Sequence, residues 1–386
     1  MKLSVKLFIK DGLRHTNLSG YGALSRNIIL ELDRLGHDVS LQRRTREWQK
    51  IESGSAERLD SLARDRHPSK SDLVLQIGTP ASCQSFRRPS LIYTQNALGD
   101  LRREWVEALR RADGCIVPSS FDKRVFDRYF DRVYIAHQSS DPRVFTPRPA
   151  QRKLGSDRFT FLFVGSYGFR KGIDLLLEAF LREFNSSEGV ELALRCPGAG
   201  TGNEFNHLLG YIQRINPQAH VTLFGAALPP EAMCRMYNRA DCVITLSRGE
   251  GWCMPVTEAL LCEVPVIAPD STAMSDYLDE DIAFLVRVTE RRISDIPEEG
   301  IATGFVRFYG EAGNVCYEPD VGAARIQMRT VVTDYEAAKH KAVAGRQVIE
   351  REFNWAKAAK GIERACVDTL EARGDRAATA PAPAGP

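Results

Sequence analysis

The 386-residue chain lacks several features that would place it in a special class of protein. No stretch reaches the roughly 18 apolar residues of a membrane-spanning helix, so we expect any membrane contact to be peripheral. The nine cysteines form no C-x-x-C pair and have no nearby histidine at zinc spacing, so we expect reduced thiols that act mostly as small core residues. The chain is also far too long for a disulfide-stapled miniprotein. Glycines 198, 200 and 202 resemble a phosphate loop, but Asn203 replaces the third glycine of the dinucleotide fingerprint. No Gly-Lys-Ser/Thr follows either, so the P-loop is also absent.

The composition is that of an ordinary globular protein, with 43% hydrophobic and 26% charged residues. A chain of this length predicts two domains. The net charge of +2 hides a split, because residues 1–150 hold 26 basic and 18 acidic residues while residues 151–386 hold 26 and 32. Such asymmetry predicts a surface or partner that one half must meet. The scattered cysteines and the lack of a visible secretion signal predict a cytoplasmic location.

Short β-branched runs alternate with helical patterns along the chain, which is typical of βαβ units and parallel sheets. The first series has expected strands at 5–9, 39–41, 73–77, 91–93 and 115–117, with a helix over 24–35 and a helix cap at Pro118-Ser119-Ser120. The second series has expected strands at 159–164, 190–194, 221–224, 242–246 and 264–267. Residues 323–370 read as helical, and residues 287–315 as an insertion or long loop.

Proline and glycine in residues 139–158 predict a linker between two α/β domains. We therefore expect a first domain over 1–150, a second over 151–352, and a disordered low-complexity tail over 373–386. Two doubly wound sheets would place a cleft between their carboxyl edges, where open α/β sheets bind ligands.

The most informative segment runs from Ser247 to Leu260, between an expected strand and an apolar helix. If Pro255 lies in the first helical turn, Glu258 falls about one turn into the helix while Glu250 stays in the loop. The helix N-terminus attracts anions, and the two carboxylates could reach different parts of a hydroxylated ligand. The alternative is that both glutamates only stabilise the start of the helix.

A second segment, residues 164–174, lies between a strand and a helix and contains Arg170 and Lys171. Its small residues let the backbone approach a ligand, and the two cations supply the charge that a diphosphate leaving group requires. A solvated basic turn is the alternative interpretation.

These segments together resemble retaining glycosyltransferases of the GT-B fold, in the large family 4 (glycosyl transferases group 1). The resemblance is carried by G-x(5)-K-G at 165–172, Glu-Gly-Trp-Cys-Met-Pro-Val-Thr-Glu at 250–258 and Val-Pro-Val-Ile-Ala-Pro-Asp at 264–270. It implies two Rossmann-like domains facing across a cleft, with a last helix over 353–372 that returns to the first domain. Weaker similarities at Ser19-Gly20-Tyr21-Gly22 and Phe353-x-Trp355 extend it over nearly the whole chain.

The resemblance implies a role for each matching residue. Glu250 would hold hydroxyls of the donor sugar, helped by backbone N–H groups of Trp252 and Cys253 beside Gly251, and Glu258 would hold the ribose. Arg170 and Lys171 would neutralise the diphosphate with the phosphate-loop Ser166, with N–H groups near Met254 and Val256, and with Gly20 and Gly22 of the first domain. Stabilising the leaving oxygens matters more here than a strong base, so we expect no metal and no cofactor.

The sequence departs from the family at three of these positions. Ser166 stands where an arginine often follows the first glycine of the phosphate loop. Thr94-Gln95-Asn96 replaces a segment that often carries a histidine close to the transferred sugar. Cys253 stands where glycine is usual, a change that leaves the backbone N–H available.

Other candidate residues have plainer interpretations. His137 and His15 could act at a site, but a lone histidine more often orders a loop. Trp105 and Trp355 fit core packing better than sugar stacking. Arginine clusters at 43–46, 87–88, 102–103 and 110–111 could draw the first domain to anionic lipid, although a solvated face is the plainer reading and no nucleic-acid motif accompanies them.

These features predict an enzyme that transfers a sugar from a nucleotide-diphosphate donor to an acceptor, with the donor in the second domain. A glycan, a glycolipid or a cell-envelope polysaccharide precursor is the expected acceptor. An epimerase or phosphorylase would need a histidine–carboxylate set or a pyridoxal lysine that the sequence does not display. A non-catalytic relative that binds a nucleotide or a protein partner remains an alternative, because Ser166 and Gln95 both depart from the family at the chemistry.

Overall fold

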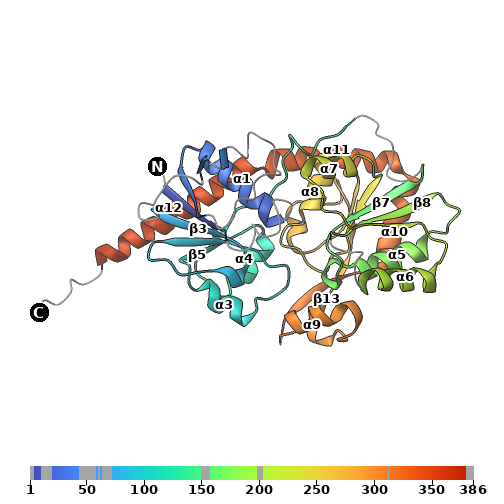
Figure 1. Ribbon diagram of the computed structural model, residues 1–386, viewed down its shortest axis with the longest axis horizontal. Coiled ribbons are helices and arrows are strands. Elements are labelled where there is room, and N and C mark those ends of the chain that lie inside the picture. The colour runs from blue at the N-terminus through green and yellow to red at the C-terminus, as the bar shows by residue number, and fades with distance from the viewer. Residues whose placement is uncertain are drawn as a thin grey trace, which may run out of the picture. The chain divides into compact units, whose positions relative to one another are not determined.

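The computed structural model describes residues 4–9, 20–42, 58–59, 61–62, 72–148, 157–197, 203–311 and 313–379 (Figure 1). The chain divides into two compact units. The first unit combines Met1–Gln95, Arg102–Gln138 and Trp355–Pro386, and the second combines Asn96–Leu101 with Ser139–Asn354. The chain therefore passes from one unit to the other four times.

The first unit is built on a six-stranded parallel sheet in the order β2-β1-β3-β4-β5-β6. Its strands are β1 (Ser4–Ile9), β2 (Asp38–Gln42), β3 (Leu73–Ile77), β4 (Ser90–Tyr93), β5 (Gly114–Val117) and β6 (Val133–Ile135). Its helices are α1 (Gly20–Arg34), α3 (Arg103–Leu109), α4 (Ser120–Phe126) and α12 (Trp355–Thr379). Every residue of β3 is buried, as expected of an apolar run in the middle of a parallel sheet.

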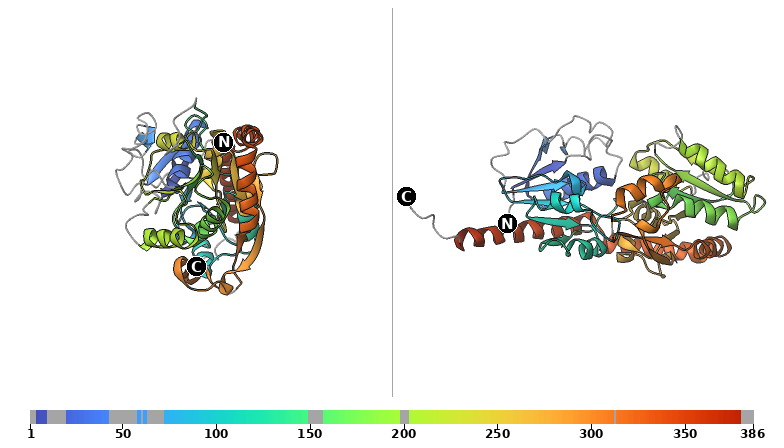
Figure 2. Two further views of the ribbon diagram at one scale, coloured as in Figure 1. Left: turned by 90° about the vertical axis from the view of Figure 1, so that its right-hand side faces the viewer. Right: turned by 90° about the horizontal axis from the view of Figure 1, so that it is seen from below.

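Helix α12 completes the core of the first unit although it comes last in the chain. It contacts α1, β5 and β6, and Figure 2 shows it running along the strands of this unit. Trp355, Ile362 and Cys366 of α12 share one buried cluster with Leu24 and Ile28 of α1. The expected return of the last helix to the first domain is confirmed.

The second unit has a six-stranded parallel sheet in the order β12-β11-β10-β7-β8-β9. Its strands are β7 (Phe159–Val164), β8 (Val190–Arg195), β9 (Val221–Phe224), β10 (Cys242–Ile244), β11 (Val266–Pro269) and β12 (Phe284–Val286). Its helices are α5 (Ile173–Glu183), α6 (Asn203–Ile215), α7 (Pro230–Tyr237), α8 (Met254–Leu261), α9 (Thr303–Tyr309), α10 (Val321–Thr333) and α11 (Tyr335–Glu352). The predicted fold class, two Rossmann-like α/β sheets, is confirmed.

Residues 287–315 were expected to be an insertion or a long loop, and the described part of this stretch contains regular elements, so the long-loop alternative is wrong. Strand β13 (Val288–Arg292) pairs antiparallel with β14 (Val315–Pro319), and α9 lies between them. We call residues 288–319 the excursion. Ile293, Ala302, Phe305 and Cys316 of the excursion form a small buried cluster with Leu98 and Phe169. Charged residues lie between these apolar positions in the sequence, so no apolar periodicity indicated the cluster.

The edges of the units differ from the expected domain bounds. Residues 139–147, assigned to the linker, already belong to the second unit, where Ser140 Oγ lies 2.8 Å from Thr257 Oγ1 and Phe145 packs on Tyr237. At the other end, α12 continues to Thr379, so residues 373–379 of the expected disordered tail are helical. Residues 149–156 and 380–386 lie outside the described residues.

Candidate functional site

The two informative segments follow neighbouring strands at the point where the second sheet reverses its order. Strands β7 and β10 are paired, and the chain leaves β7 toward β8 on one side and β10 toward β11 on the other. Open α/β sheets bind ligands at the carboxyl ends of strands at such a reversal. Residues 165–171 follow β7 and residues 245–253 follow β10, so the topology brings the basic turn and the acidic loop together.

Two glycines allow these loops to approach neighbouring backbone closely. Gly172 ends the 3-10 turn Phe169–Lys171 with a φ of +67°, and a Cβ there would lie 1.8 Å from the carbonyl oxygen of Leu246. A Cβ on Gly249 would lie 1.8 Å from the carbonyl oxygen of Ala97. Any other residue at either position would push the loop out of place.

Glu250 is a buried carboxylate at the centre of a charge cluster. Its side chain is 6% exposed, and Lys171 Nζ donates a hydrogen bond to its Oε1 at 2.5 Å. Arg170 Nη1 lies 3.3 Å from the other carboxylate oxygen and donates to the carbonyl oxygen of Gly249 at 2.6 Å. The structure therefore brings Glu250, predicted to hold the donor sugar, together with the two cations predicted to neutralise the diphosphate.

The charge state of Glu250 follows from these neighbours. Burial alone would raise its pKa, but Lys171 and Arg170 outweigh that effect and lower the pKa to about 2. Glu250 is therefore ionised at neutral pH. An ionised carboxylate accepts hydrogen bonds and cannot act as a proton donor, so its chemistry here is that of a hydrogen-bond acceptor.

The start of α8 completes the loop that carries Glu250. Cys253 caps the helix with a φ of +73°, in the left-handed region where glycine is favoured, which accounts for glycine being usual at this position. Trp252 is buried, and Tyr277 holds it by ring contact at 4.7 Å and by a hydrogen bond of 2.7 Å to its carbonyl oxygen. The Val256 N–H donates to the carbonyl oxygen of Cys253 at 3.1 Å, so this predicted phosphate donor already closes a turn.

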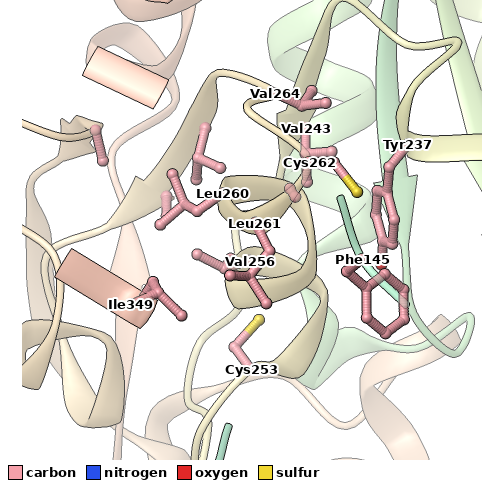
Figure 3. Close-up of a cluster of buried hydrophobic side chains, with 14 of the residues drawn as sticks. Phe145, Tyr237, Val243, Cys253, Val256, Leu260, Leu261, Cys262, Val264 and Ile349 are labelled. Carbon is pink, nitrogen blue, oxygen red and sulfur yellow. The ribbon is translucent and has the colours of Figure 1, made fainter. Parts of the chain in front are cut away.

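The apolar side of α8 fixes the helix in the second unit. Val256, Leu260 and Leu261 point into a buried cluster, and Figure 3 shows Cys253 at the beginning of the same helix. Tyr237 and Phe145 lie together at one side of this cluster, with ring centroids 6.0 Å apart. A rigid core behind α8 keeps the positions of its first-turn residues constant.

Glu258 has a different environment from Glu250. It is half-buried, and Tyr237 Oη donates a hydrogen bond to its Oε2 at 2.6 Å. Burial raises the pKa of Glu258 to about 7, against the lowering effects of the Tyr237 hydrogen bond and of nearby Arg195. The two glutamates are thus an ionised carboxylate and one that titrates near neutrality.

The remaining predicted residues lie in less informative places. Ser166 is exposed in the loop after β7, and Gly251 is buried before α8. Gly20 and Gly22 belong to the first turn of α1 in the first unit, so the expected loop is already helix there. His15, Arg43, Arg44, Arg46 and glycines 198, 200 and 202 lie outside the described residues.

The first unit contains the position where a histidine is usual. Gln95 accepts a hydrogen bond from Gln138 Nε2 at 2.8 Å, so its amide oxygen has a partner within this unit. His137 Nδ1 lies 2.8 Å from the carbonyl oxygen of Pro118, which fits the loop-ordering interpretation. Trp355 is buried in the cluster that α12 shares with α1, and Arg102 Cζ lies 6.0 Å from the centroid of the Trp105 ring.

Several residues that shape the site were not predicted. Arg248 is buried two residues before Glu250, and Thr272 Oγ1 accepts a hydrogen bond from the Glu250 N–H at 3.2 Å. Thr272 has a φ of +58°, which is strained for a β-branched residue. Their roles could not be predicted because the partners of both residues lie far away in the sequence. The one sequence feature that could have drawn attention to Arg248 is its charge within a loop that contains two glycines.

The described part of the chain offers neither a metal centre nor a membrane-spanning helix. No group of three or more histidine, cysteine, aspartate or glutamate side chains among these residues could hold a metal ion. No helix among them is long and apolar enough to cross a membrane. All nine cysteines lie in the described ranges, and each is free and buried.

Comparison with known proteins finds a family match within the second unit. Residues 146–294 match the model of the family described as "Glycosyl transferases group 1". A segment of 121 residues is 30% identical to the D-inositol 3-phosphate glycosyltransferase of Segniliparus rotundus and covers 31% of this chain. The chain spans about a quarter (27%) of the length of that curated relative.

Solved structures match over nearly the whole chain. Sucrose-phosphate synthase from Thermosynechococcus elongatus has a TM-score of 0.65 at 17% identity, over 97% of this chain and 99% of its own. A glycosyltransferase from Rickettsia africae has a TM-score of 0.67 at 12% identity, over 95% and 98%. HepE from Anabaena, solved with UDP and glucose, has a TM-score of 0.65 at 15% identity, over 95% and 100%.

Identities this low show the fold alone, and the family match covers only residues 146–294. Each neighbour has the two Rossmann-like units known as GT-B, and the matched segment contains the basic turn and the acidic loop described above. Residues 146–294 thus resemble the group 1 glycosyl transferases, and the chain as a whole has the GT-B fold.

Proposed function

We propose that the protein transfers a sugar from a nucleotide-diphosphate sugar to an acceptor with retention of anomeric configuration, and that the second unit binds the donor. The observation that carries this proposal is the cluster of buried Glu250 with half-buried Lys171 and Arg170 at the reversal point of the second sheet. Breaking a sugar–phosphate bond leaves negative charge on the diphosphate, and two fixed cations at that place stabilise it.

Each charged residue has a distinct role in this proposal. Arg170 and Lys171 neutralise the diphosphate oxygens as the bond breaks, assisted by backbone N–H groups at residues 252–254. Glu250, ionised at neutral pH, accepts hydrogen bonds from hydroxyls of the transferred sugar. Glu258, one turn into α8, accepts hydrogen bonds from the ribose hydroxyls. Ion pairing with Glu250 holds both cations in place before the donor binds, which lowers the cost of organising the site.

A uridine nucleotide is the first donor to test. HepE from Anabaena was solved with UDP, with UDP and glucose, and with UDP-glucose. Its fold matches 95% of the length of this chain. We propose that the acceptor, a glycan, a glycolipid or a polysaccharide precursor, binds the first unit. Exposed Arg87, Arg103, Arg110 and Arg111 of that unit suit an anionic acceptor or membrane surface. Nine buried free thiols support a reducing, cytoplasmic location.

The test uses two readouts that do not require a known acceptor. Binding of UDP, GDP, ADP, dTDP and CMP is measured by thermal shift and calorimetry, and the slow hydrolysis of the matching sugar nucleotide is measured by nucleotide release. Glu250→Gln is expected to bind the nucleotide and lose hydrolysis by about a hundredfold, because the sugar loses an ionised acceptor. Glu280→Gln, an exposed glutamate of the same unit, is the control.

The alternative is a protein that binds a nucleotide or a partner without catalysis. Two observations favour it: Ser166 in place of arginine, and Gln95 hydrogen-bonded to Gln138 where a histidine is usual. Nucleotide binding with no hydrolysis or transfer by the unmodified protein would support this alternative. Equal hydrolysis by Glu250→Gln and Glu280→Gln would remove Glu250 from the mechanism.

A further inference from the structure

Arg248 is a nearly enclosed arginine next to the proposed donor site, and none of the roles above uses it. Its side chain is 2% exposed. Two of its donors bind Asp174 of α5, with Nη1 at 2.8 Å and Nη2 at 2.7 Å from the two carboxylate oxygens. Nη1 also donates to the carbonyl oxygen of Phe169 at 2.6 Å, and Nε donates to Glu318 Oε2 at 2.9 Å.

The main chain of Arg248 joins the same segments. Its N–H donates to the carbonyl oxygen of Arg170 at 2.7 Å, and its own carbonyl oxygen accepts from the Tyr317 N–H at 2.9 Å. One residue thus binds the carbonyls of Phe169 and Arg170, which form the turn that carries the two cations. The cations then pair with Glu250, two positions beyond Arg248.

The excursion supplies the other side of this arrangement. Glu318 on β14 lies between Arg248 and Arg291 of β13, whose Nη1 donates to Glu318 Oε1 at 2.8 Å. The buried cluster of the excursion also includes Phe169, whose ring lies 5.3 Å from that of Phe305. The guanidinium of Arg248 stacks over the ring of Phe169, with Cζ 3.6 Å from the ring centroid. Phe169 is therefore held both by the excursion and by Arg248.

From this geometry we infer that Arg248 and Glu318 are a positioning pair: they fix the 169–171 turn so that Arg170 and Lys171 face Glu250, and they make the excursion part of the donor site. The inference rests on the proposed function, because it assigns the pair to the binding of a nucleotide diphosphate. Neither residue contacts the reacting atoms in this assignment.

The residue types fit this role. A guanidinium offers five N–H donors at fixed angles in one plane, whereas a lysine ammonium offers three donors from one atom. A lysine at position 248 could not bind Asp174, Glu318 and the Phe169 carbonyl together. The Glu318 side chain is 24% exposed, so its neutral amide analogue is tolerated where loss of the buried arginine would endanger folding.

The test compares Arg248→Lys, Glu318→Gln and the double variant in the full chain. Arg287→Ala is the control, because Arg287 forms an exposed pair with Asp320 just before the excursion and has no bond to Arg248 or Glu318 among the described contacts. The first readout is hydrogen exchange of backbone amides in residues 165–173 without ligand. The second is the Kd for UDP, and thermal unfolding reports the stability of each variant.

We expect the single variants to accelerate amide exchange at 165–173 and to weaken UDP binding about tenfold, with the double variant no worse than the more affected single one. Arg287→Ala leaves both readouts unchanged. The inference would be overturned if amides 165–173 exchanged as slowly in Glu318→Gln as in the Arg287→Ala control. It would also be overturned if the losses of UDP affinity in the two single variants added up fully in the double variant. If the unmodified protein binds none of the nucleotides, the proposed function fails, while the exchange data still decide whether the pair positions the turn.

Discussion

Replacing Lys171 by methionine tests the electrostatics of the proposed site directly. Lys171 lies 2.5 Å from Glu250 and is the nearer of its two cationic partners. Relative to an ordinary glutamate at 4.5, the pKa of about 2 at Glu250 corresponds to about 3 kcal/mol of stability at neutral pH, at about 1.4 kcal/mol for each pKa unit. Because the folded pKa is depressed, this contribution is present above pH 4.5 and is lost as the pH falls toward 2.

Without Lys171, burial dominates and the pKa of Glu250 rises. We expect Lys171→Met to unfold more easily than the unmodified protein by about 3 kcal/mol at pH 7, because a buried carboxylate keeps only Arg170 as a cationic partner. The difference is expected to shrink as the pH falls, because a protonated Glu250 needs no partner. Cys253 and Tyr277 also interact with Glu250, and burial keeps the pKa of each raised, so both stay neutral over this range.

Urea unfolding at several pH values between 4 and 8 measures this effect. The double variant Lys171→Met/Glu250→Gln is the control, since it has no ionisable group at position 250 and its deficit is expected to stay constant from pH 8 to about pH 5, above the range in which the unmodified protein loses the Glu250 contribution. A Lys171→Met deficit that stays constant from pH 8 to pH 4 would refute the assignment of Glu250 as a carboxylate held ionised by Lys171.

Three further predictions concern other parts of the molecule. Tyr237→Phe removes the hydrogen bond that lowers the pKa of Glu258, so this pKa rises above about 7. The affinity for UDP, measured by calorimetry, should then change with pH around a higher midpoint. An unchanged midpoint would mean that Glu258 does not bind the ribose. Gly172→Ala places a Cβ 1.8 Å from a carbonyl oxygen at a φ of +67° and should abolish UDP binding, whereas Gly168→Ala meets nothing within 4 Å and should bind normally; equal binding by the two would mean that the turn can rearrange. Trp355→Ala should lower the free energy of unfolding by about 3–5 kcal/mol in urea titrations, and a loss below about 1 kcal/mol would show that α12 docks weakly.

Apolar runs made several strands predictable, in the middle of a sheet and at its edge. The expected strands at 73–77, 159–164 and 221–224 coincide with β3, β7 and β9. The three-residue strands β6 and β12 were missed, whereas the equally short β10 was found because a longer apolar run, 242–246, contains it. Ser119 caps α4 as expected, since its side chain accepts a hydrogen bond from the Asp122 N–H.

The sequence indicated the parts of the site that lie on single segments. Glu250 and the Arg170–Lys171 pair stand in local patterns of glycine, proline and charge, which a reader can recognise without a fold. Glu318 stands 70 residues after Arg248, and no short-range pattern links them. Contacts of this kind are set by chain topology, so the excursion became part of the site only in three dimensions.

The alternation of the chain between its units affects how it can be made. Core residues of the first unit lie on α12, which emerges from the ribosome only after all of the second unit. The early strands must therefore wait for about 200 residues of synthesis before they can bury Trp355 and its neighbours, at translation rates of about 5–20 residues per second. The second unit has the opposite history, since its segment Asn96–Leu101 is made first and Gly249 later packs on Ala97. A fragment that starts at Ser139 would lack that segment, so neither unit can be isolated by a single cut in the gene.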